Sequence, residues 1–205
     1  CRPTERSDIR ESKGRWNISH EVARVAPCPH LSDFLDDDVS ADSLKAQSNT
    51  AQTNIRNAQR RITDLGSDPS KADYVVDCDA STQKSNYRLD CSPCITRSRC
   101  NGHWVTSKNR RFTIPEMMRL QGMNPTKCYV DGTKRDLGEQ IGNAMSVNVI
   151  ERVLLRALQA LHMIADTVTD RWKSGEALQE IKLTKGKFMR KYVRKTDCEI
   201  PGRDT

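Results

Sequence analysis

The chain has 205 residues, of which 36% are hydrophobic and 30% charged, and its mean hydropathy is −0.74. This length suffices for one domain, but the apolar content is small for the core of a large enzyme, so we expect part of a larger protein. The formal net charge of +7, with a pI near 9.1, favours a polyanionic partner. Neither a signal-peptide pattern nor an apolar run near the ~18 residues of a membrane helix occurs, so we expect no membrane partner.

The first third of the chain predicts an extended lead-in followed by one helix. Residues 1 to 30 are charged and lack hydrophobic periodicity, and prolines mark their end. Residues 50 to 65 place Ile55, Ala58, Ile62 and Leu65 on one helical face and Arg56, Arg60 and Arg61 on the other. Asp68-Pro69 follows, and this pattern predicts an amphipathic helix that ends before it. Tyr74-Val75-Val76 predicts a short strand, and the Ser, Thr, Asn and Asp residues up to position 93 predict a loop-rich region.

The stretch from Cys91 to Pro115 contains no acidic residue. Its basic side chains suit the phosphates of a nucleic acid, and they are Arg97, Arg99, Lys108, Arg110 and Arg111. A solvated basic loop without a ligand is the alternative. A second basic segment, Lys185 to Lys195, has apolar residues at helical spacing, so it is either a nucleic-acid or nuclear-import patch or a solvated helix face.

The eight cysteines of the chain raise an alternative of another class. Cys91, Cys94, Cys100 and His103 are ligand types that suit tetrahedral zinc, although their spacing is irregular for a zinc finger. A zinc-bearing nucleic-acid-binding module without enzymatic activity is therefore the alternative. Our main interpretation has no metal, and it expects free thiols because no secretory signal favours disulfides.

Two blocks in the second half carry the most specific signal. In the first, Arg110 to Gly122, Thr113 and Glu116 have the spacing of a capping box, and Gly122 is a helix stop. This block predicts a helix from about Ile114 to Gln121. In the second, Gly138 to Ile150, Gly142-Asn143 predicts a tight turn, and Ser146 predicts the cap of a long helix. The apolar residues of that helix predict one buried face, formed by Val147, Ile150, Leu154, Leu158, Leu161 and Ala165.

Together, the two blocks resemble the last two conserved motifs of the DNA (cytosine-5) methyltransferases, in order and in spacing. Residues 92 to 99 also resemble the Ser-Pro-x-[IL]-Thr-x-Ser segment at the end of that family's target-recognition domain. The resemblance implies S-adenosylmethionine as methyl donor and double-stranded DNA as partner. It implies a donor pocket closed by Asn143, Ala144 and Met145, and it places Thr96 near the backbone of the flipped cytosine.

The catalytic motifs of this family do not occur between Cys1 and Thr205. The sequence has no Phe-x-Gly-x-Gly donor loop, no Pro-Pro-Cys-Gln and no Glu-Asn-Val. Methylation of cytosine C5 needs a thiolate that attacks C6 and an acid at N3, so we expect no catalytic residue here and no activity of the isolated chain. We therefore expect a C-terminal fragment that works with the remainder of the catalytic domain.

The resulting fold expectation is α/β: the C-terminal portion of a Rossmann-like S-adenosylmethionine-dependent methyltransferase, mostly recognition lobe and helices, with the central sheet largely missing. We expect a lead-in over residues 1–30, a target-recognition region over 31–112, C-terminal motifs and a closing helix over 113–170, and a basic tail over 171–205. By resemblance, the protein is expected in the nucleus of a eukaryote or in the cytoplasm of a bacterium.

Overall fold

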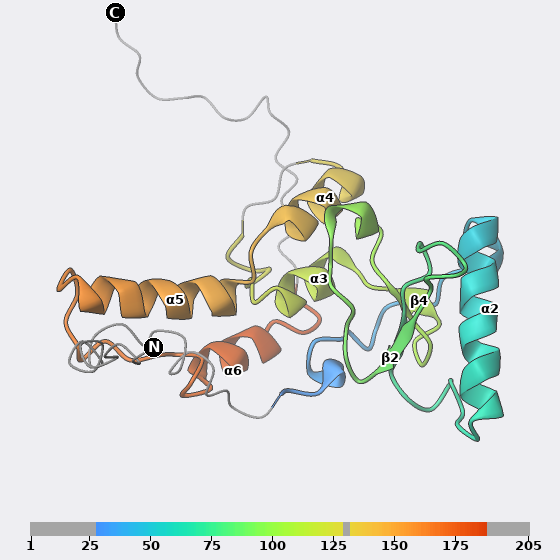
Figure 1. Ribbon diagram of the computed structural model, residues 1–205, viewed down its shortest axis with the longest axis horizontal. Helices are drawn as coiled ribbons and strands as arrows, with labels where there is room; N and C mark the ends of the chain where they lie inside the picture. The colour runs from blue at the N-terminus through green and yellow to red at the C-terminus, as the bar shows by residue number, and fades with distance from the viewer. Residues whose placement is uncertain (1–27, 129–131, 188–205) are drawn as a thin grey trace, which may run out of the picture.

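The computed structural model describes residues 28–128 and 132–187. Most of the predicted lead-in, and the tail beyond residue 187, lie outside the described residues. The α-helices are α2 (Asn49–Asp64), α3 (Ile114–Leu120), α4 (Lys134–Asn143), α5 (Val147–Ala160) and α6 (Glu176–Lys182). The strands are β1 (Tyr74–Val76), β2 (Tyr87–Leu89), β3 (Trp104–Val105) and β4 (Arg110–Arg111), and short 3-10 helices are η1 (Leu31–Asp33), η2 (Leu44–Ala46) and η3 (Arg97–Arg99). Figure 1 shows α2 at one end of the molecule and α5 with α6 at the other.

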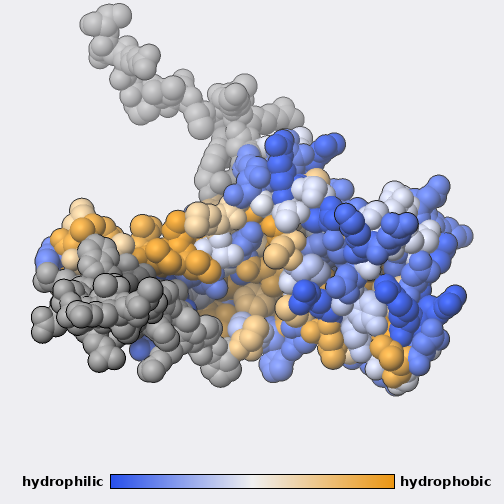
Figure 2. Space-filling view, in the orientation of Figure 1, coloured by the Kyte–Doolittle hydropathy of each residue, from blue (hydrophilic) through white to orange (hydrophobic). Residues whose placement is uncertain are grey.

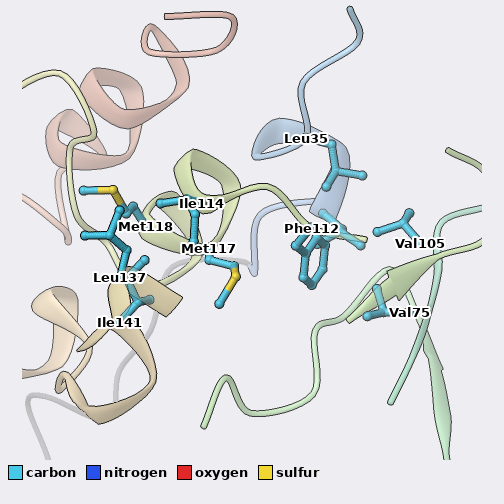
Figure 3. Packing of buried hydrophobic residues seen from close by; sticks show 10 residues of the cluster. Leu35, Val75, Val105, Phe112, Ile114, Met117, Met118, Leu137 and Ile141 are labelled. Atoms are coloured by element: carbon cyan, nitrogen blue, oxygen red, sulfur yellow. The ribbon is translucent and has the colours of Figure 1, made fainter. Parts of the chain in front are cut away.

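The described strands form a small antiparallel sheet in the order β2-β1-β3-β4. Strand β1 uses alternate side chains to contact two cores, as the period of two in a strand requires. Val75 packs with the cluster that contains Phe112 and the helices α3 and α4, and Val76 packs with Trp104 against α2. The sheet thus lies between α2 on one face and helices α3 and α4 on the other. Figure 3 shows the cluster that joins the sheet to α3 and α4.

Helix α2 confirms the helix predicted over residues 50 to 65, with bounds shifted by one residue. The side chain of Ser48 caps it by accepting from the Ala51 amide, and Ala51, Ile55, Ala58 and Ile62 are buried. The predicted strand at 74–76 is also confirmed, as β1. Amphipathic periodicity was a sufficient signal here, because it acts within a few residues of the chain; the Ser48 cap was not predicted.

Helix α3 confirms the predicted capping box. The Thr113 side chain accepts from the Glu116 amide, and the Glu116 carboxylate accepts from the Thr113 amide at 2.7 Å. Met117 and Met118 of this helix are buried in the same cluster as Leu137 and Ile141 of α4. The first block is therefore fixed between the sheet and the helix that carries the second block.

The predicted buried face of the last long helix is wrong for the described residues. Helix α5 has an apolar side, but Leu154 is 51% exposed and Leu161, its C-cap residue, is 64% exposed. Within α5, Gln159 is the buried residue, and Val147 and Ile150 are half-buried. Figure 2 shows hydrophobic residues at the surface over α5, at the end of the molecule opposite the hydrophilic surface of α2. Periodicity identified the apolar face, but it carries no information on whether another segment covers it.

Candidate functional site

The Arg and Glu of the first block form an ion pair in the protein interior. Arg110 in β4 donates to Glu116 in α3 through both terminal nitrogens, at 2.8 and 2.7 Å, and both side chains are at most 1% exposed. The same Glu116 carboxylate accepts from the Asp36 amide at 2.7 Å. A phosphate cannot reach a guanidinium that is buried and already occupied in this way. The structure therefore corrects the assignment of Arg110 to DNA binding, and gives it a role in folding.

The other basic residues of the acid-free stretch also have carboxylate partners. Arg111 donates to Asp79 at 2.7 and 2.8 Å, and Arg99 donates to Asp77 at 2.6 and 3.0 Å. Asp77 holds the pKa of Arg99 above its ordinary value, mainly through this hydrogen bond. Both aspartates lie outside the stretch from Cys91 to Pro115. The absence of acidic residues within that stretch therefore did not reveal that Arg99 and Arg111 are neutralised in the fold.

Two basic side chains of this stretch are paired in more exposed positions. Arg97 lies at 3.0 Å from Glu139 of α4 with 68% of its side chain exposed, and Lys108 lies at 2.7 Å from Asp37. Thr96 is exposed and precedes η3, with its hydroxyl 3.1 Å from that of Ser98. Of the residues predicted to contact DNA, Thr96 and Arg97 are therefore the two that the structure leaves most open to a ligand.

Gln121, the last side chain of the first block before its glycine, holds the second block in place. Its amide nitrogen donates to the Ile141 carbonyl at 3.1 Å, and its side-chain oxygen accepts from the Ser146 hydroxyl at 2.7 Å. Its backbone carbonyl accepts from the Val147 amide at 2.8 Å. Gln121 is 8% exposed, so these contacts are shielded from water. Sequence reasoning missed this residue because nothing local shows which partner a buried glutamine amide has.

The segment between these anchor points contains the three residues predicted to contact the methyl donor. Asn143 and Met145 are exposed, and Ala144 is half-buried. The tight turn predicted at Gly142-Asn143 is not observed: both residues belong to the last turn of α4, and the chain becomes extended at Ala144. Ser146 is the N-cap residue of α5, but its side chain makes no capping bond because it donates to Gln121. The three predicted residues thus form a surface segment that is held at both ends.

Two glycines bring this segment against the predicted DNA-contact segment. A Cβ atom on Gly138 would lie 2.0 Å from the Cys100 carbonyl oxygen, and one on Gly142 would lie 2.3 Å from the Thr96 carbonyl carbon. No real Cβ contact is that short, so α4 packs against residues 96–100 only because it lacks side chains there. The spacing of four residues between the glycines, which places them on one helix face, was the available sequence signal.

The ligand set of the zinc alternative is not assembled. Cys91 and Cys94 are exposed, whereas His103 is 1% exposed and its Nε2 lies 3.2 Å from the Cys94 carbonyl oxygen. Burial lowers the pKa of His103. Within residues 28–128 and 132–187, no group of three or more His, Cys, Asp or Glu side chains could hold a metal ion. The structure therefore gives the zinc alternative no support.

The sequence matches the family of C-5 cytosine-specific DNA methylases over residues 10–159. The chain therefore belongs to the C-5 cytosine-specific DNA methylase family. A comparison with curated proteins finds no match. None of the helices in the described part of the chain is both long and apolar enough to cross a membrane. The family agrees with the resemblance of the two blocks, which both lie within the matched residues.

Proposed function

We propose that this chain is the C-terminal part of a DNA cytosine-5 methyltransferase. It supplies recognition of double-stranded DNA through residues 31–112 and one wall of the S-adenosylmethionine pocket through Asn143, Ala144 and Met145. The observation that carries the proposal is the clamp made by Gln121, which fixes Ile141 and Ser146 on either side of an exposed segment. A segment held at both ends and open between them suits a ligand contact.

The side chains of this segment fit the polar and apolar parts of the donor. The Asn143 amide is exposed and has no hydrogen-bond partner among the described residues, and Met145 is 64% exposed. An amide offers both a donor and an acceptor, and a methionine side chain adapts to an irregular apolar surface. When bound, S-adenosylmethionine supplies the methyl group, and these residues bind and orient it.

The DNA contact is proposed at Thr96 and Arg97, which lie beside α4, the helix that leads into the donor segment. Glycines of α4 bring residues 96–100 into van der Waals contact with the helix that ends at Asn143. A protein group must hold the distorted strand when a cytosine leaves the stack, and the exposed Thr96 hydroxyl suits that role. Arg99 and Arg111 are each paired with an aspartate, so we assign them to the support of this region and not to the phosphate contact.

The chemistry of cytosine methylation requires groups beyond those proposed here. The attacking thiolate and the acid at N3 belong to the remainder of the catalytic domain, because the sequence has no Pro-Pro-Cys-Gln and no Glu-Asn-Val. The exposed apolar face of α5 supports this arrangement, since a surface of that kind is typical of an interface. We also propose a nuclear location in a eukaryote, or a cytoplasmic one in a bacterium, where DNA is accessible.

Donor titration tests this proposal on the assembled enzyme, in which the chain is joined to a catalytic portion that carries the missing motifs. Asn143→Ala should weaken S-adenosylmethionine binding by about 5- to 150-fold, which corresponds to about 1–3 kcal/mol for an unpaired polar group. Gln140→Ala, in the same turn of α4 and also exposed, is the control and should leave donor affinity unchanged. A lower melting temperature of Asn143→Ala with unchanged donor affinity would remove Asn143 from the pocket.

A further inference from the structure

A polar cavity of about 270 Å³ lies on the recognition lobe, between α2 and the loop that joins β1 to β2. Residues of α2 and of the loop before β2 line it: Asn57, Arg60, Arg61, Thr82, Gln83 and Ser85. These side chains are amides, hydroxyls and guanidiniums, and no carboxylate is among them. Figure 2 shows a hydrophilic surface over α2, which Figure 1 places at the opposite end from α5.

The positive charge of this cavity is not neutralised as it is in residues 96–111. Arg61 has no carboxylate partner among the described residues, and its guanidinium lies over the Tyr87 ring at 5.3 Å. The contact of Arg60 with Asp64 is long, at 3.8 Å, and both side chains are largely exposed. Lys84, in the loop that lines the cavity, and Arg88 in β2 are exposed and also have no ion-pair partner in the described part of the chain. Arg60 and Arg61 are therefore two guanidiniums of the cavity wall that no carboxylate holds closely.

The cavity wall is also fixed from within. Asn54, a further lining residue, is fully buried, and its amide nitrogen donates to the carbonyls of Cys78 and Ala80 at 2.8 Å each. These bonds tie α2 to the segment that leads into the loop. The side-chain oxygen of Asn54 is buried without a hydrogen-bond partner. Buried acceptors are normally paired, so this oxygen suits a water molecule; a DNA phosphodiester has no hydrogen to donate to it and would be held by the guanidiniums instead.

We propose that this cavity binds a phosphate group of the DNA backbone, held by Arg60 and Arg61, at a site separate from Thr96 and Arg97. Guanidiniums bind phosphate through paired N–H groups, and the neighbouring amides and hydroxyls donate further hydrogen bonds. That the phosphate belongs to DNA rests on the proposed function. That the cavity binds a phosphate group is inferred from its guanidiniums, amides and hydroxyls. A second backbone contact on the lobe would fix its orientation along the duplex without reading sequence.

Fluorescence anisotropy of a labelled duplex, titrated with the full chain at several salt concentrations, tests this site. Arg60→Ala/Arg61→Ala should reduce the slope of log affinity against log salt by about 0.9 for one lost phosphate contact, with about tenfold weaker binding near 0.1 M salt. Lys45→Ala/Lys71→Ala removes the same charge from exposed positions of the same lobe outside the cavity, and should leave the slope unchanged. Arg60→Lys/Arg61→Lys should retain most of the slope.

The outcomes separate the sources of phosphate and the two proposals. Inorganic phosphate should compete no better than chloride at equal ionic strength, and specific competition would instead assign the cavity to a small phosphorylated molecule. An equal slope for the wild type and for Arg60→Ala/Arg61→Ala, with both folded by circular dichroism, would overturn the cavity site. It would leave the proposed function standing, because donor titration tests that separately. No DNA binding by the wild-type chain would overturn both.

Discussion

Arg110 and Glu116 join β4 to α3 through two parallel hydrogen bonds of 2.8 and 2.7 Å in a site that water does not reach. A second ion pair, Arg119 with Asp36 at 2.6 Å, lies beside it, and the Asp36 amide also donates to Glu116. Residues of the first block therefore hold Asp36, which follows η1, through both its side chain and its backbone. Arg110 and Arg119 of this block therefore stabilise the fold, and their positive charge is not evidence of DNA binding.

Glu116→Gln should lower the free energy of unfolding by about 3–5 kcal/mol, because it leaves the buried Arg110 guanidinium without a counter-charge. The loss is measured by urea denaturation followed by circular dichroism. Arg97→Ala breaks an exposed ion pair and is the control, with a far smaller effect. Equal losses for the two variants would show that burial does not set the strength of the Arg110–Glu116 pair.

Gly142→Ala should destabilise the protein by about 1–3 kcal/mol, because the new Cβ would overlap the backbone at Thr96. The direction of the change in stability is informative, because replacing glycine by alanine within a helix without such a contact stabilises the protein by up to about 1 kcal/mol. Gln140→Ala, on the exposed side of the same helix, gives the baseline. A stabilised Gly142→Ala protein would show that α4 and residues 96–100 are not in close contact.

Gln121→Leu should weaken S-adenosylmethionine binding to the assembled enzyme about 5- to 150-fold, since the Ile141 carbonyl and the Ser146 hydroxyl both lose a buried partner. Under the proposed function, Gln121 positions the donor-contact residues without touching DNA, so DNA affinity should change little. Calorimetry with the donor and anisotropy with DNA measure the two effects. A parallel fall in both affinities would indicate general unfolding of the second block.

Stability should fall as the pH is lowered from 7.5 towards 5.5, because burial depresses the pKa of His103 in the folded protein. The unfolded chain then binds a proton near pH 6.5 that the folded chain does not, so the contribution of His103 is fully present above pH 6.5 and is lost below it. His103→Gln should flatten this dependence of the melting temperature on pH.

His30 provides the comparison of opposite sign. The hydrogen bond with Asp90 raises the pKa of His30, so its contribution is present at low pH and is lost as the pH rises. His30→Gln should therefore make the loss of stability on acidification steeper. A flatter profile for His30→Gln than for the wild type would contradict the raised pKa of His30.

The parts of the fold that sequence could predict are those that depend on neighbouring residues. Helix α2, strand β1 and the capping box at Thr113 and Glu116 follow from periodicity and from contacts within four residues. The turn predicted at Gly142-Asn143 was wrong, because this pair does not reveal that α4 continues through both residues. The donor contact of Asn143, Ala144 and Met145 stays a prediction.

Long-range pairings could not be predicted in the same way. The aspartates that neutralise Arg99 and Arg111 come from the segment after β1, and the partner of Arg97 comes from α4. A run of basic residues therefore gave a false impression of free charge, whereas Arg61 of α2, outside that run, has no carboxylate partner among the described residues. Which surface covers the apolar side of α5 is likewise a property of tertiary structure that periodicity cannot supply.

Transfer of tritiated methyl groups from S-adenosylmethionine to cytosine C5 of duplex DNA tests the central claim most directly. The chain alone should incorporate nothing above a blank without protein, because its sequence has neither the Pro-Pro-Cys-Gln nor the Glu-Asn-Val motif. The chain joined to a catalytic portion with both motifs should methylate DNA, and the catalytic portion alone should not. Methylation by the isolated chain, or equal methylation by the catalytic portion without it, would contradict the account.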